Sequence, residues 1–249
     1  MNRKIRVGAV NYLNTRPLIY GFEQGEMAGL ADLVVDYPSK IATMLANDEI
    51  DVGLVPVAVI PELKEHHIIS EYCISCDGEV ASVCLFSDVP LTQIEQVLLD
   101  YQSRTSVELL KLLIKNYWKI DPAFLSTTED YRKEITNTTG GLVIGDRALE
   151  QRKISKYHYD LGAEWKKYTG LPFVFAAWIS NKKLDPIFIN AFNRANGTGL
   201  QQIDTVVKEN PFEAFDLQSY YTQYIRYQLD DKARKGLEVF LEMLSKDRP

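Results

Sequence analysis

The sequence predicts an α/β protein whose chain builds one sheet, leaves it and then builds a second. Strand-like apolar runs alternate with helix-like segments, which is typical of parallel sheets with right-handed crossovers. The alternation is interrupted over residues 68–87, where two β-rich runs flank the turn signal Asp77-Gly78. The 249 residues, 46% of them hydrophobic, can bury either one large core or two smaller ones.

The first third of the chain holds the clearest alternation of strand and helix. Strands are predicted at residues 5–10, 33–37 and 51–55. The helices between them are expected at residues 15–22, with Asn14 as the N-cap, and at 38–45, opened by Pro38 and Ser39.

Beyond the interruption the alternation resumes. Further strands are predicted at residues 96–99, 141–146, 157–161 and 173–180, and further helices at 105–118, 147–152 and 163–168 and through most of the chain after Asp185. No flexible linker is visible, so two lobes would be joined by strands. We expect a discontinuous first lobe of residues 1–87 and 175–249, and a second lobe of residues 88–174.

Composition excludes several classes of protein. No apolar run approaches the roughly 18 residues of a membrane span. Arg3 and Lys4 precede an apolar segment, as in a secretion signal, but that run ends at Asn11 without a cleavage site, so a cytoplasmic protein is expected. A net charge of −6 and the lack of a basic stripe argue against nucleic-acid binding.

Three cysteines, Cys73, Cys76 and Cys84, cannot form a complete disulfide framework because their number is odd. The Cys73-x-x-Cys76 pair could serve zinc only with a second pair or well-spaced histidines, so buried thiols are favoured. Four tyrosines at helical spacing are expected to pack between elements rather than to form a cofactor site: Tyr220, Tyr221, Tyr224 and Tyr227.

The first candidate site is the start of the helix after Asn14. The amides of Thr15, Arg16 and Leu18 are expected to lack intrahelical partners, and Pro17 fits the first turn. Such a helix end attracts anions. The alternative is that Asn14 only caps a surface helix.

A second helix start follows the strand at residues 96–99. There Thr105 and Glu108 match a capping box, and Ser103 and Ser106 add two hydroxyls. Ligands of open α/β sheets bind at such carboxyl ends of strands. The two helix starts would give each lobe one site that attracts anions.

The third candidate is Gly145-Asp146, after the buried run at residues 142–144. Glycine allows a ligand to approach the backbone, and Asp146 could accept a hydrogen bond or act as a base. Asp146 could equally be a helix N-cap. Ser82, on the chain between the two sheets, is a weaker candidate.

Four segments together resemble the chorismate dehydratases of the futalosine-dependent menaquinone route. They are Val7-Gly8-x-Val10-Asn11-Tyr12-Leu13-Asn14-Thr15-x-Pro17-Leu18, Gly53-Leu54-Val55-Pro56-Val57, Ser103-Arg104-Thr105-Ser106-Val107 and Ile144-Gly145-Asp146-x-Ala148. The resemblance implies the type II architecture of periplasmic binding proteins, with two α/β lobes, two connecting strands and a cleft. It also implies that water is removed from chorismate to give 3-[(1-carboxyvinyl)oxy]benzoate, without a cofactor or metal.

Carried over by position, the resemblance gives Asn14 and Asp146 as catalytic residues. The residues expected to bind the substrate are Thr15, Arg16, Pro56, Val57, Ser82, Ser103, Thr105, Ser106 and Gly145. Chorismate is a dianion, and two helix starts across a cleft could each take one carboxylate. The base could be Asp146 or the enolpyruvyl carboxylate of the substrate, whereas His66, His67 and His158 lie outside the matched motifs.

Three other functions share the expected fold. A non-catalytic protein that binds a small carboxylate would have both helix starts, but an export signal is expected for it. The sister enzyme that makes 1,4-dihydroxy-6-naphthoate is disfavoured by the opening motif. A regulatory ligand-binding domain would require a DNA-binding segment, for which the chain has no room. The sequence leaves the oligomeric state open.

Overall fold

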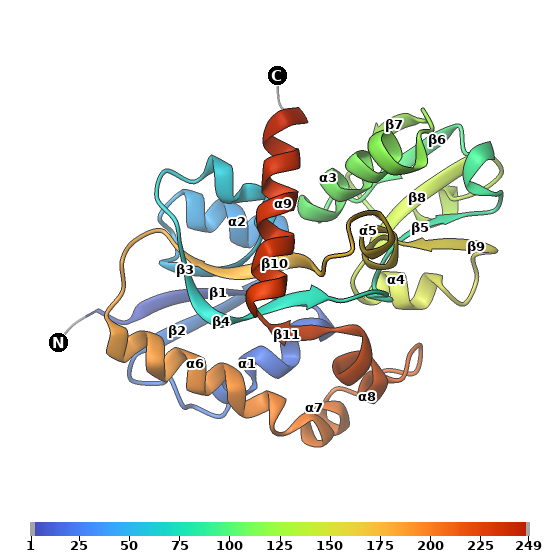
Figure 1. Ribbon diagram of the computed structural model, residues 1–249. Helices are drawn as coiled ribbons and strands as arrows, with labels where there is room; N and C mark the ends of the chain where they lie inside the picture. The colour runs from blue at the N-terminus through green and yellow to red at the C-terminus, as the bar shows by residue number, and fades with distance from the viewer. Residues whose placement is uncertain (1–2, 248–249) are drawn as a thin grey trace.

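Two β-sheets form the framework of the computed structural model, which describes residues 3–247 (Figure 1). The strands of the first sheet are β1 (Ile5–Val10), β2 (Ala31–Asp36), β3 (Val52–Pro56), β4 (His67–Cys76), β10 (Phe173–Ser180) and β11 (Arg226–Gln228). Their order is β11-β4-β10-β3-β1-β2. β1 pairs in parallel with β2 and β3, while β10 runs antiparallel to both β3 and β4.

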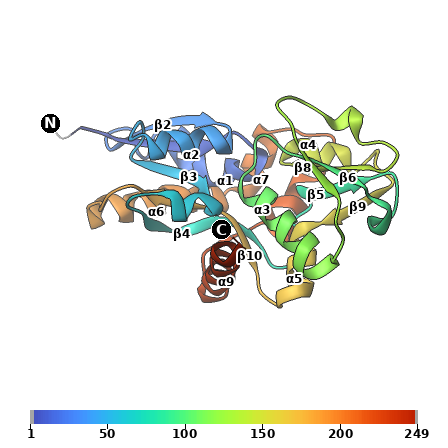
Figure 2. The same cartoon turned by 90° about the horizontal axis from the view of Figure 1, so that it is seen from above.

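The second sheet contains β5 (Val83–Ser87), β6 (Gln96–Leu99), β7 (Ala123–Ser126), β8 (Thr139–Ile144) and β9 (Tyr157–Asp160), in the order β7-β6-β8-β5-β9. β6 pairs in parallel with β7 and β8, and β5 runs antiparallel to β8 and β9. Seen from above, the elements of the two sheets occupy opposite halves of the molecule (Figure 2).

Helices cover the sheets. They are α1 (Arg16–Glu23), α2 (Pro38–Ala46), α3 (Thr105–Leu112), α4 (Asp146–Gln151), α5 (Leu161–Thr169), α6 (Pro186–Leu200), α7 (Ile203–Glu209), α8 (Leu217–Ser219) and α9 (Asp231–Asp247). Shorter helical turns include η1 (Leu13–Thr15), η2 (Val57–Glu62), η4 (Leu113–Trp118) and η6 (Tyr220–Tyr224). No helix within residues 3–247 has both the length and the apolar character needed to cross a bilayer.

Apolar runs in the sequence explain which strands lie deepest. Every residue of β3, β5 and β10 is buried, as expected for strands covered on both faces. α1 packs closely on α6, where a Cβ on Gly21 would come within 2.3 Å of the main-chain oxygen of Ala195. The predicted buried thiols are confirmed, because Cys73, Cys76 and Cys84 are all buried and unpaired.

The chain changes sheet between Cys76 and Val83 and returns between Thr169 and Phe173. β5, which our prediction assigned to the first lobe, therefore hydrogen-bonds within the second sheet. The turn signal Asp77-Gly78 does not close a hairpin, since β4 and β5 belong to different sheets. We propose lobes of residues 3–76 with 173–247 and of residues 83–172; residues 1–2 and 248–249 lie outside the described residues.

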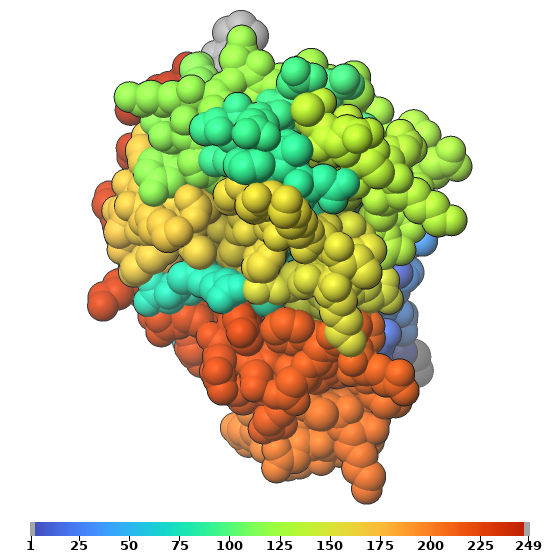
Figure 3. Space-filling model, turned by 90° about the vertical axis from the view of Figure 1, so that its right-hand side faces the viewer, coloured from blue at the N-terminus to red at the C-terminus, as the bar shows by residue number. Residues whose placement is uncertain are grey.

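The C-terminal part of the chain ties the two lobes together. α9 contacts β10 and η2 of the first lobe and also α3 of the second. The segment around α7 and α8 (orange to red in Figure 3) lies directly below the second lobe. There the Lys153 ammonium donates to the Glu213 carbonyl at 3.0 Å. Tyr227, predicted to be helical, lies instead in β11.

Candidate active site

A pocket lies between the two lobes, with an empty volume of about 510 Å³ that includes open solvent. Sites for small molecules have volumes of this order. Its apolar wall comes from Val10, Pro38, Pro56, Ile74, Val80, Val83, Ile144, Phe175 and Ala176. Its polar wall comes from Tyr12, Asn14, Ser82, Ser103, Thr105, Ser106 and the backbone of Gly145. Asn14 and Ser106, taken from the two predicted helix starts, thus face one cavity.

The polar wall is uncharged. Among the described residues that line the pocket there is no Asp, Glu, Lys, Arg or His side chain. Tyr12 is its single ionisable group, and burial raises the pKa of that phenol well above the ordinary value. The pocket therefore offers hydroxyl and amide groups as hydrogen-bond partners, and none of them is an ordinary general base at neutral pH.

Three hydroxyls of the pocket already accept a hydrogen bond from the protein. The amide of Ser106 donates to Ser103 Oγ at 3.1 Å, and the amide of Ala58 donates to Thr105 Oγ1 at 3.2 Å. The Ser82 Oγ accepts from the phenol of Tyr220 at 2.7 Å. A hydroxyl carries one donor hydrogen and two acceptor lone pairs, and each of these bonds uses one lone pair, so the O–H can still donate to a ligand. Such a set of donors suits an anion.

Asn14 lies in the 3₁₀ turn η1 and is buried. Its predicted role as N-cap is wrong: α1 begins at Arg16, Thr15 takes the N-cap position, and no side chain caps the helix. The Asn14 Oδ1 instead accepts from the Thr15 hydroxyl at 3.3 Å. Its main-chain oxygen accepts from the phenol of Tyr227 at 2.9 Å.

The predicted anion site at this helix start is also wrong in part. The amide of Thr15 donates to the Tyr12 carbonyl at 3.0 Å, and that of Arg16 donates to the Leu13 carbonyl. Because the 3₁₀ turn precedes the α-helix, two of the three amides expected to be unpaired already have partners. Side chains, rather than α1 amides, supply the polar groups at this end of the pocket.

At the second helix start the capping box is wrong as well. α3 has Arg104 at its N-cap position, so Thr105 lies inside the helix. Its hydroxyl accepts from Ala58 in the first lobe, and the Glu108 carboxylate accepts from Lys111 at 3.1 Å. Ser103, one residue before the N-cap, supplies the hydroxyl that binds a helix amide.

Gly145 follows β8 with φ +64° and ψ −148°, a conformation that is costly for residues with a side chain. A Cβ there would also lie 3.0 Å from the ring of Tyr12. Gly145 occupies the N-cap of α4, so the alternative that Asp146 is the N-cap is wrong. Glycine is therefore needed for both the turn and the contact with Tyr12.

Asp146 does not line the pocket. Its Oδ1 accepts a hydrogen bond from the amide of Leu13, in the other lobe, at 3.0 Å. Burial raises the pKa of this carboxyl from the ordinary 3.8 to about 6, against the opposing effects of the Leu13 amide and the Arg16 charge. Its position makes Asp146 a contact between the lobes.

Three other residues that were expected to bind the substrate do not line the pocket either. Thr15 is fully buried beside Asn14, Arg16 pairs with Glu23 at 3.4 Å, and Val57 is buried at the start of η2. The predicted residues that do line the pocket are Asn14, Pro56, Ser82, Ser103, Thr105, Ser106 and Gly145.

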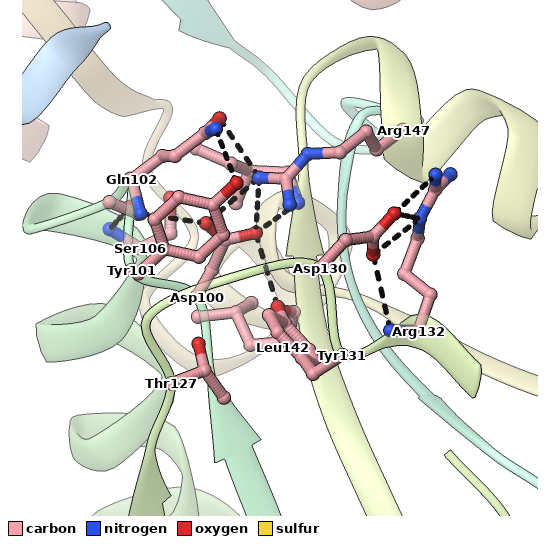
Figure 4. Close-up of polar contacts among 12 residues, drawn as sticks. Asp100, Tyr101, Gln102, Ser106, Thr127, Asp130, Tyr131, Arg132, Leu142 and Arg147 are labelled. Atoms are coloured by element: carbon pink, nitrogen blue, oxygen red, sulfur yellow. Dashed lines mark hydrogen bonds and ion pairs between the residues drawn. The ribbon is translucent and has the colours of Figure 1, made fainter. Parts of the chain in front are cut away.

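A buried polar network beside the pocket was missed by sequence reasoning (Figure 4). Asp100, directly after β6, accepts from the amide of Gln102 at 2.9 Å, from the phenol of Tyr131 at 3.1 Å and from Arg147 Nη2 at 2.8 Å. Gln102 in turn accepts from Tyr12 of the first lobe. The polar run Asp100-Tyr101-Gln102 at the end of a predicted strand was the signal that could have revealed this network.

Comparisons with known proteins agree on one family and one fold. A family model described as "Menaquinone biosynthesis" matches residues 5–246. A chorismate dehydratase of Thermus thermophilus is 28% identical over 233 residues, covering 83% of this chain and 84% of the relative. Among solved structures, a protein from Archaeoglobus fulgidus matches with a TM-score of 0.79 at 15% identity, covering 98% of this chain and 97% of that one.

A Candida albicans protein described as having the generic periplasmic binding protein fold matches with a TM-score of 0.62. The two are 12% identical, and the match covers 98% of this chain and 94% of that one. At this identity the likeness establishes the fold. The predicted α/β architecture with two lobes and a cleft, of the kind found in periplasmic binding proteins, is confirmed.

Proposed function

The chain belongs to the menaquinone biosynthesis family, and from that premise we propose that it is a chorismate dehydratase, a lyase that eliminates water from chorismate. The observation that carries the proposal is the similarity to the chorismate dehydratase of Thermus thermophilus over 83% of this chain, within a family model that matches residues 5–246. The substrate would occupy the pocket between the lobes. The proposal keeps the cytoplasmic location that the sequence leads us to expect.

The donor groups of the pocket support an anionic substrate. We assign the hydroxyls of Ser82, Ser103 and Thr105 to the carboxylates of chorismate, since each accepts a hydrogen bond within the protein and still has its O–H to donate. Asn14 faces the same space from the other lobe and would bind the reacting region. Hydrogen bonds to a charged acceptor are about twice as strong as neutral ones, which offsets part of the cost of removing the dianion from water.

Beyond binding the dianion, the protein needs to contribute little to the elimination itself. The proton at the ring carbon that bears the enolpyruvyl ether is acidified through the ring by the carboxylate, and loss of the neighbouring hydroxyl makes the ring aromatic. Hydrogen-bond donors fixed at the ring carboxylate stabilise the negative charge that develops there. The other contribution of the protein to the rate is to hold the substrate in the conformation from which water is eliminated.

The residues that reach the pocket bear on the choice of base. Its lining residues provide no carboxylate or imidazole, and the carboxylate of Asp146 is turned to the Leu13 amide. We therefore propose that the enolpyruvyl carboxylate of the substrate removes the proton and passes it to the neighbouring hydroxyl, which leaves as water. In this proposal Asp146 holds the lobes together.

Product analysis tests the function. Purified protein is incubated with chorismate, and the expected product is 3-[(1-carboxyvinyl)oxy]benzoate, detected by its aromatic absorbance and its mass. Asn14→Ala should lower the rate, whereas Asn47→Ala, at an exposed asparagine beyond α2, should leave it unchanged. Chorismate recovered intact with wild-type protein that binds it would instead identify a carboxylate-binding protein of the same fold.

A further inference from the structure

We propose that Tyr12 is a positioning residue that couples closure of the two lobes to completion of the pocket wall. It acts through a hydrogen bond to Gln102, which Arg147 and Asp100 hold in place. The inference rests on the proposed function only in its choice of substrate. The bond from Tyr12 connects the first lobe to the buried network of the second. Asp100, Gln102 and Arg147 of that network are labelled in Figure 4.

Tyr12 lies between the end of β1 and the start of η1, and it is buried. Its phenol donates to Gln102 Oε1, which lies 90 positions later in the chain and in the other lobe. The same Oε1 also accepts from Arg147 Nη2 at 3.0 Å. Gln102 Nε2 donates to the phenol of Tyr101 at 2.9 Å. These contacts fix which way the amide of Gln102 points, with its oxygen toward the first lobe.

Arg147 is itself held firmly. Its Nη2 donates to both carboxylate oxygens of Asp100, at 2.8 and 3.0 Å, and its guanidinium lies 5.3 Å from the centre of the Tyr101 ring. Asp100 is buried and also accepts from the amide of Ile144 at 3.3 Å. A buried ion pair with these additional bonds resists displacement, since moving either partner leaves a buried charge unpaired. Gln102 thus presents a preorganised acceptor.

Whereas the hydroxyl of Tyr12 binds Gln102, its ring forms part of the pocket wall. It lines the pocket and packs against Gly145, whose missing Cβ leaves room for it. If the lobes separated, the phenol would leave Gln102 and the ring would leave Gly145 together. The wall of the pocket and the contact between the lobes would therefore be lost in one step. The bonds from Leu13 to Asp146 and from Ala58 to Thr105 also join the lobes, but they do not use a ring that lines the pocket.

Tyr12→Phe tests this because it removes the hydroxyl and keeps the ring. Gln102 Oε1 keeps its bond from Arg147, so no buried acceptor is left unpaired. One net hydrogen bond is worth about 0.5–1.5 kcal/mol, so the ratio of closed to open protein should fall roughly 2- to 12-fold, and KM for chorismate should rise by up to that factor. The kcat should stay within about 2-fold, since saturating substrate restores closure. Small-angle scattering should show a larger radius of gyration for the variant before substrate is added.

Tyr131→Phe is the matched control. It removes another buried phenol of the same network, but the single O–H of Tyr131 is shared between Asp100 and the Leu142 carbonyl, both in the second lobe. This variant should lower the melting temperature while its KM and radius of gyration match the wild type. The proposal is overturned if Tyr12→Phe equals the wild type in both KM and radius of gyration, or if Tyr131→Phe changes them as much.

The two proposals can fail separately. If wild-type protein leaves chorismate unchanged, the proposed function fails, and the scattering comparison of the wild type with Tyr12→Phe still decides the role of Tyr12. If the wild type is active and Tyr12→Phe matches it in KM and in size, only the role of Tyr12 is wrong.

Discussion

The carboxylate of Asp146 accepts a hydrogen bond from the main-chain amide of Leu13 at 3.0 Å, and this bond joins the two lobes. Asp146 begins α4 in the second lobe, whereas Leu13 lies in η1, next to Asn14. The carboxylate is therefore turned to the backbone beside the pocket and not into the pocket itself. Two predictions follow from this position, one for activity and one for stability.

Asp146→Asn should keep kcat/KM for chorismate within about fivefold of the wild type. Removing a general base costs about 10²- to 10⁴-fold, whereas asparagine retains an oxygen that can accept from Leu13. The measurement is the initial rate of product formation at pH 7.5, on variants checked for folding. A loss of 100-fold or more would assign the proton transfer to Asp146 and reject the carboxylate of the substrate as the base.

The same substitution should make stability less dependent on pH. Because burial raises the pKa of Asp146 from 3.8 to about 6, the native state holds this proton more tightly than the unfolded state. Its contribution to stability is full below about pH 4 and is lost as the pH rises through 6. The two pKa values correspond to about 3 kcal/mol. Asp146→Asn should thus gain up to about 3 kcal/mol over the wild type at pH 7.5 and nothing at pH 4.

Urea unfolding at both pH values measures this difference. Asp100 and Asp160 are also buried carboxyls with a raised pKa, but they are present in both proteins and cancel in the comparison. An equal effect of the substitution at pH 4 and pH 7.5 would show that the carboxyl of Asp146 titrates normally.

Much of the fold could be predicted from the sequence, because strand and helix periods are local signals. The assignment of β5 was an exception. Its apolar run follows β4 across a turn signal, and a local pattern cannot tell a hairpin from a chain that crosses to another sheet. The pairing of β5 with β8 and β9 depends on residues more than 50 positions away.

The candidate site was likewise predicted where the sequence signal is local and missed where the contact joins distant residues. Asn14 and Ser106 both line the pocket, and both come from strand-to-helix junctions visible in the sequence. The helix caps were predicted wrongly because residue preferences do not reveal a 3₁₀ turn or a helix that starts one residue earlier. The pair of Asp100 with Arg147 spans 47 positions, and no local spacing indicates such a contact.

A third prediction concerns Asp51, which is 3% exposed and binds three cations. Its carboxylate pairs with Arg3 at 3.0 Å, Arg6 at 3.0 Å and Lys182 at 2.6 Å. Burial alone would raise the pKa of Asp51, but the hydrogen bonds from Arg6, Lys182 and Arg3 hold it well below its ordinary value. This contribution to stability is present above about pH 4 and is lost as the pH falls further.

Asp51→Asn should therefore destabilise the protein by about 1.5–3 kcal/mol at pH 7.5, because it removes the charge that accepts hydrogen bonds from Arg3, Arg6 and Lys182. The loss should shrink as the pH falls below 4, since the wild type then loses the same charge. Asp32→Asn, at an exposed carboxylate that pairs with Lys4, is the control and should change stability by less than about 1 kcal/mol. A constant loss at every pH would mean that packing, and not charge, explains the effect of Asp51.

The last prediction separates the two reasons for a glycine at position 145. Gly145→Ala must adopt φ +64° and must also push the ring of Tyr12, which lies 3.0 Å from the new Cβ. Gly25→Ala is the control, since Gly25 has φ +84° but no atom within 4 Å of its Cβ. Both substitutions should lower the free energy of unfolding by about 1–3 kcal/mol through the backbone. Only Gly145→Ala should also raise KM for chorismate, because it displaces a ring that lines the pocket. Equal KM values for both variants would show that the ring of Tyr12 can shift without consequence for binding.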